Sequence, residues 1–75
     1  MSNLSDQIVD LLAPAIGKNM ALASVKSNCK KMGITPEELS SKHINEFINN
    51  ITPGLNVFAG NDFAEKTAAK MRQLR

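Results

Sequence analysis

Apolar residues recur every three or four positions along most of this 75-residue chain, and this spacing constrains its fold more than any other feature. Residues at that spacing share one face of an α-helix, where they can be buried together. The clearest example is the stripe formed by Ile44, Phe47, Ile48 and Ile51. The period-two alternation that is typical of β-strands is confined to a few residues around 55–58. The sequence therefore predicts an all-α fold.

Four main helices and one short helix are expected, joined by connections of only a few residues. Short connections make consecutive helices neighbours, which favours a compact irregular bundle. A chain of this length forms one domain at most, so residues 1–75 are expected to share a single core. The main helices are predicted at 4–16, at 17–32, from the Ser40–Ser41 cap to Ile51, and at 61–74, and the short helix is predicted between Thr52 and Gly60.

Glycine and proline mark helix boundaries on either side of Ile34. Gly33 is expected just after the C-terminus of the second helix, where a residue without a Cβ adopts a positive φ at no steric cost. Thr35, Pro36 and Glu38 then form a helix-start signal. Thr35 can cap the turn, proline suits the first helical position, and Glu38 completes a capping box.

Two further prolines fall inside otherwise helical patterns. Pro14 lacks the N–H that an interior helical position donates, so a kink or break is expected near Ala13. Pro53 allows two interpretations, a kinked helix that continues to Phe58 or a new short helix that is capped by Thr52. The second interpretation is favoured, because proline suits the first position of a helix.

Composition and cysteine content indicate a folded protein of a reducing compartment. Hydrophobic residues make up 43% of the chain and charged residues 21%, which fits a globular domain rather than a disordered segment. The single cysteine cannot form an internal disulfide. No apolar run approaches the roughly 18 residues of a membrane span, and the N-terminus lacks the basic and apolar regions of a secretory signal. We expect a cytoplasmic location and no membrane association.

The residue types that carry catalysis or hold metals do not occur in a recognisable set. Cys29 lies on an apolar stripe near the end of the second predicted helix, where burial and the helix dipole both oppose a thiolate. His43 is the only histidine, and no second His or Cys stands at the spacing of zinc ligands. It falls off the apolar stripe and is expected to be a solvated surface residue. The chain is therefore expected not to be an enzyme and to bind no cofactor or metal.

Charge changes sign from segment to segment, and the second predicted helix is basic. Only segments 18–33 and 61–75 carry net positive charge. Lysines on the outer face of the second helix support an alternative function, contact with the phosphates of a nucleic acid. Arginine is absent before Arg72, and the start of this helix is mostly apolar, so side chains that read bases are missing. The lysines of this alternative are Lys18, Lys26, Lys30 and Lys31.

The runs SVKSNCKKMGITPEEL and INEFINNITPGLNVFAGNDFAEKTAAKMRQL form a composite pattern over about residues 15–74. It combines a basic helix, a TPEEL turn, a central helix, a G-L-x-V-F-x-G segment and a closing helix rich in Ala and Lys. This pattern resembles small helical accessory domains that occur alone or appended to signalling and regulatory proteins of archaea and bacteria. The resemblance implies a structural or protein–protein role, with no enzymatic activity and no site residues to carry over.

We therefore expect a non-enzymatic protein-interaction or regulatory module, whose partner is another protein or a second copy of itself. A chain this short covers only part of its large apolar residues with its own core. Phe47 and Ile51 are expected to be internal. Phe58 and Phe63 flank a glycine turn, so one of them is expected at an apolar surface patch. The expected interaction surface comprises Phe58, Phe63 and Met71.

Overall fold

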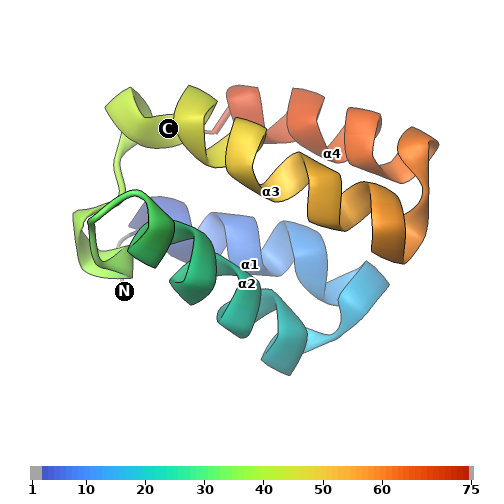
Figure 1. Ribbon diagram of the computed structural model, residues 1–75, viewed down its shortest axis with the longest axis horizontal. Helices are drawn as coiled ribbons and strands as arrows, with labels where there is room; N and C mark the ends of the chain where they lie inside the picture. Colours follow the sequence, from blue (N-terminus) through green and yellow to red (C-terminus); the bar gives the residue numbers. More distant parts are fainter. Residues whose placement is uncertain (1–2, 75) are drawn as a thin grey trace.

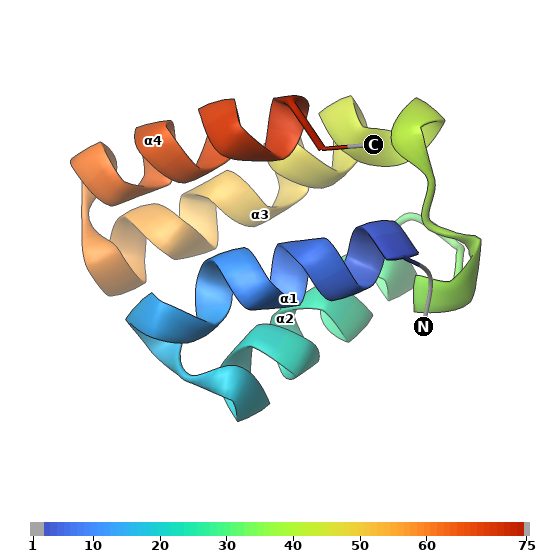
Figure 2. The ribbon, with the colours of Figure 1, turned by 180° about the vertical axis from the view of Figure 1, so that it is seen from behind.

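The computed structural model describes residues 3–74, which form two helical hairpins packed against each other (Figures 1 and 2). Helices α1 and α2 form the first hairpin, and α3 and α4 form the second. No strand is present in this described part of the chain, and the predicted all-α bundle is confirmed. The bounds are Asn3–Ile16 for α1, Lys18–Lys31 for α2, Ile44–Ala59 for α3 and Asn61–Arg72 for α4, with 3-10 turns at Pro36–Glu38 and Ser41–His43.

A single glycine closes each hairpin. Gly17 connects α1 to α2 with φ 84°, and Gly60 connects α3 to α4 with φ 88°. Residues with a Cβ rarely adopt such values, so glycine lets the chain reverse within one residue. Both connections lie at the same end of the long axis of the molecule (Figure 1).

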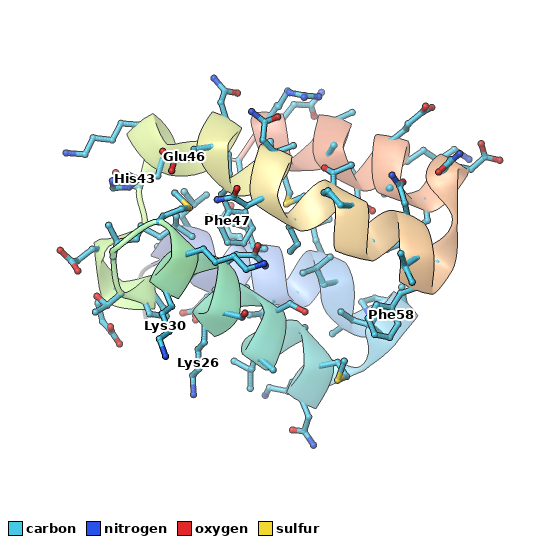
Figure 3. All side chains as sticks on the ribbon, in the orientation of Figure 1. Lys26, Lys30, His43, Glu46, Phe47 and Phe58 are labelled. Carbon is cyan, nitrogen blue, oxygen red and sulfur yellow. The ribbon has the colours of Figure 1, made fainter. Side chains whose placement is uncertain are left out.

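The core lies between the two hairpins. Phe47 of α3 points into this space (Figure 3) and has no exposed surface. Ile51 is only 4% exposed, so both residues that were predicted to be internal are so. Burial of the facing apolar stripes is the main favourable contribution to folding, at about 25 cal/mol per Å² of apolar surface removed from water. The other large residues of the core include Leu4, Ile8, Val9, Leu12, Val25, Leu39, Ile44, Ile48, Leu55 and Met71.

The predicted end of the second helix is confirmed. Gly33 has φ 74°, and its N–H donates a hydrogen bond to the carbonyl oxygen of Lys30 at 3.0 Å. The N–H of Ile34 donates to the carbonyl oxygen of Cys29, also at 3.0 Å. These two bonds are those of a Schellman motif, which satisfies carbonyl groups at a helix C-terminus.

The start signal at Thr35 forms, and a short 3-10 turn follows it, as the nearby second cap at Ser40 and Ser41 predicts. The Glu38 carboxylate accepts hydrogen bonds from the Thr35 N–H at 2.9 Å and from the Thr35 hydroxyl at 3.1 Å. A second cap comes immediately afterwards, because Nδ1 of His43 accepts a hydrogen bond from the N–H of Ser40 at 3.1 Å. This second cap leads directly into α3.

The prediction of a separate short helix after Thr52 is wrong. Helix α3 continues without interruption from Ile44 to Ala59, with Pro53 inside it. Ile51 and Leu55 are both buried, so one apolar stripe runs past the proline on the core side. Pro53 itself is exposed, and the burial of the stripe outweighs the lost backbone hydrogen bond.

Helix α1 also continues past its proline. It runs through Pro14 to Ile16, so no break occurs at Ala13. Pro14 is exposed and lies in the last turn of the helix, where few further backbone hydrogen bonds depend on it.

Candidate interaction surface

The large apolar side chains that are exposed in the described chain gather at one end of the molecule. Met20 is 43% exposed, Val57 85% and Phe58 65%. Met20 lies in the first turn of α2, and Val57 and Phe58 lie in the last turn of α3. Both turns adjoin the glycine connections that share one end of the long axis (Figures 1 and 2), and Figure 3 shows Phe58 there. We call these three residues the apolar end.

Phe58 is exposed although its position on α3 matches the buried stripe. It follows Ile51 by seven residues and Leu55 by three, and both of those residues are buried. Phe58 differs from Ile51 and Leu55 in its position along the helix axis. It lies in the last turn of α3, at the end of the molecule where both hairpins reverse direction (Figure 1). A group of large apolar side chains left in water is a feature of interaction surfaces.

The structure separates the three residues of the predicted interaction surface. Phe58 lies on the surface, Phe63 is half-buried against the core, and Met71 has no exposed surface. The Met71 side chain therefore contributes to the core and not to the surface. Sequence reasoning missed Met20 and Val57. The sequence feature that could have identified them is their position three residues from Gly17 and from Gly60, because the other helices do not extend over the ends of the hairpins.

The four lysines of α2 are all exposed. Helix α2 contains no Asp or Glu, so no carboxylate within the helix offsets their charge. Lys26 and Lys30 stand four residues apart and point the same way, away from the second hairpin (Figure 3). Lys18, Lys26, Lys30 and Lys31 constitute what we call the lysine face.

Cys29 belongs to the core, as predicted. Its side chain has no exposed surface. Burial raises the pKa of the Cys29 thiol, and the negative charge of Glu37 raises it further. A thiol with a raised pKa is a poor nucleophile at neutral pH. Among residues 3–74, no group of three His, Cys, Asp or Glu side chains is arranged to hold a metal ion.

His43 differs from its prediction as a solvated surface residue. It is half-buried, and its Nδ1 accepts the N–H of Ser40. That role requires an unprotonated Nδ1, which places the ring proton of the neutral imidazole on Nε2. His43 therefore takes the place of the Glu or Gln that usually completes a capping box.

A shallow groove of about 420 Å³ lies between α3 and α4. Its lining combines buried apolar side chains with exposed side chains, two of which are charged. The lining residues are Ile48, Asn49, Thr52 and Pro53 of α3, and Ala64, Glu65, Ala68 and Arg72 of α4.

Two further findings bear on the class of protein. No helix within the described residues combines the length and the apolar character needed to cross a bilayer. Comparisons with protein-family models, with curated proteins and with solved structures found no match to this chain.

Proposed function

We propose that this protein is a non-enzymatic interaction module of the cytoplasm, which binds a protein partner or a second copy of itself through the apolar end. The observation that supports this proposal most strongly is the 65% exposure of Phe58, a residue whose spacing on α3 matches the core. A partner that covers this ring removes apolar surface from water and gains the corresponding free energy. Aromatic side chains are common anchors of protein interfaces.

The remaining chemistry of the chain agrees with this proposal. The cysteine is buried and its pKa is raised, and the histidine serves as a helix cap. The resemblance to accessory domains of prokaryotic signalling and regulatory proteins supports a regulatory role for the interaction. A free buried thiol also suits the reducing cytoplasm.

Affinity isolation from the cells that make the protein tests the proposal. The wild type and two variants, Phe58→Ser and Phe58→Leu, are compared after circular dichroism has shown that all three are folded. We expect the wild type and Phe58→Leu to retain the same partner, because both present an apolar side chain, and Phe58→Ser to lose it. Equal recovery of the partner by Phe58→Ser would contradict the proposal.

A second candidate function is nucleic-acid binding through the lysine face. The exposure of all four lysines on a helix without acidic residues favours it. The logarithm of the association constant for duplex DNA or RNA should then fall linearly with the logarithm of salt concentration. The double variant Lys26→Gln, Lys30→Gln should bind more weakly and with a smaller salt slope. The absence of any binding at low salt removes this candidate.

A further inference from the structure

We propose that the groove between α3 and α4 docks a second copy of this chain, with the α4 helices of the two copies packed antiparallel about a two-fold axis. The inference goes beyond the proposed function, because it places a contact between two copies on a face other than the apolar end. On the α4 side the groove is lined by the buried side chains of Ala64 and Ala68 and by the exposed side chains of Glu65 and Arg72.

The charged residues on the groove rim form a pattern that is complementary to itself. Glu65 and Arg72 are both exposed and stand seven residues apart on α4. Seven residues make nearly two helical turns, so both side chains project from one face, with Ala68 and Ala69 between them. A two-fold axis that passes between Ala68 and Ala69 therefore places Glu65 of each copy opposite Arg72 of the other.

Ala69 is exposed at the centre of this face and has only a methyl side chain, which lets the two helices approach closely. Helix axes pack about 8–10 Å apart, and small side chains favour the lower end of that range. At that separation a Glu65 carboxylate and an Arg72 guanidinium on the other copy can form a bidentate pair. An isologous interface uses the same patch on both copies, so this pair occurs twice in each dimer.

The groove and the apolar end face different directions. Asn49 and Pro53 are the exposed residues of α3 that line the groove. Asn49 precedes Phe58 by nine residues, which places the two side chains about half a helical turn apart around α3. Substitutions on one surface therefore leave the other intact, and the two can be tested separately.

Sedimentation of the wild type and of charge-reversal variants tests this dimer. We expect the wild type to show a concentration-dependent increase in mass toward a dimer at protein concentrations up to about 1 mM. Glu65→Arg and Arg72→Glu each replace two attractions by two repulsions, so each should weaken dimerisation about tenfold or more. An equimolar mixture of the two variants should recover dimers. In a mixed dimer the two introduced side chains face each other with opposite charges, and the native Glu65 of one copy faces the native Arg72 of the other.

Two matched substitutions control for the change in net charge and in helix charge. Asp10→Arg changes the net charge as Glu65→Arg does, at an exposed site on α1 outside the groove, and Lys70→Glu matches Arg72→Glu on another face of α4. Both should dimerise as the wild type does. A wild type that stays monomeric, or single variants that dimerise as the wild type does, would overturn the inference. So would a mixture of variants that stays monomeric. A dimer that persists in Glu65→Arg but is lost in Phe58→Ser would overturn this inference and support self-association at the apolar end.

Discussion

The hydroxyl of Thr52, the residue before the proline inside α3, donates a hydrogen bond of 2.6 Å to the carbonyl oxygen of Ile48. Four residues separate the two, as in the backbone hydrogen bonds of the helix. The side chain thus adds a bond to the turn that Pro53 weakens, since Pro53 has no N–H to donate to Asn49. Helix α3 is continuous here because the apolar residues before and after Pro53 are buried in the same core.

Replacement of Pro53 by alanine should therefore stabilise the protein. Proline in a helix interior costs about 3 kcal/mol relative to alanine, and its restriction of the unfolded chain offsets about 0.4–1 kcal/mol of that cost. We expect a gain of about 2–2.6 kcal/mol in the free energy of unfolding, measured by urea denaturation at low protein concentration. Pro36→Ala, at the first position of its turn, should bring no gain. Equal effects of the two substitutions would argue against an uninterrupted α3.

The prediction at Pro53 failed because the sequence signals of a helix start and of a helix interior are the same there. Thr52 and Pro53 suit the cap and the first position of a new helix. The burial of Leu55 in the core instead favours a single helix that continues past Pro53, and this burial depends on tertiary packing. The end at Gly33 was predictable, because a Schellman motif depends on local residues.

The surface was less predictable than the helices. Spacing identifies Met71 and Phe58 alike as members of apolar stripes, yet one is buried and the other 65% exposed. Which of them is covered depends on how far the neighbouring helices extend, and that is set by the arrangement of the two hairpins.

The Thr35–Glu38 cap should make stability depend on pH. Hydrogen bonds from the backbone N–H and hydroxyl of Thr35 lower the pKa of Glu38 below its usual value. A carboxyl whose pKa is lower in the folded state stabilises above its unfolded pKa of about 4.3. That contribution is lost as the pH falls through the lower folded pKa. The wild type should therefore exceed Glu38→Gln in unfolding free energy at pH 7, and the difference should shrink toward pH 3. A difference that is constant over this range would show that the cap does not bind the ionised carboxylate.

Cys29 should react slowly with a thiol reagent in the native state and rapidly after denaturation. Burial both blocks access and raises the pKa of the thiol. Ser27→Cys in a Cys29→Ala background supplies the control, because Ser27 is exposed two residues away on the same helix. That cysteine should be modified rapidly without denaturant. Native Cys29 that reacts as fast as the control would contradict its placement in the core.

Two phenylalanines of α3 should respond very differently to truncation. Phe47 has no exposed surface, so Phe47→Ala should cost about 3–5 kcal/mol of stability through lost burial and a cavity. Phe58 is mostly exposed, and Phe58→Ala should change stability by no more than about 0.5 kcal/mol. Denaturant titration of both variants measures the difference. A large loss in Phe58→Ala would identify this ring as part of the core and remove it from the apolar end.

The central claim is that the apolar end contacts a protein, and photocrosslinking in living cells tests it most directly. Benzoylphenylalanine is introduced in place of Phe58 at the apolar end or in place of Asn45, which is exposed in the first turn of α3 at the other end of that helix. After irradiation, we predict a discrete crosslinked protein species from position 58 and none from position 45. Position 58 that yields no adduct, or the same adducts as position 45, would contradict the account.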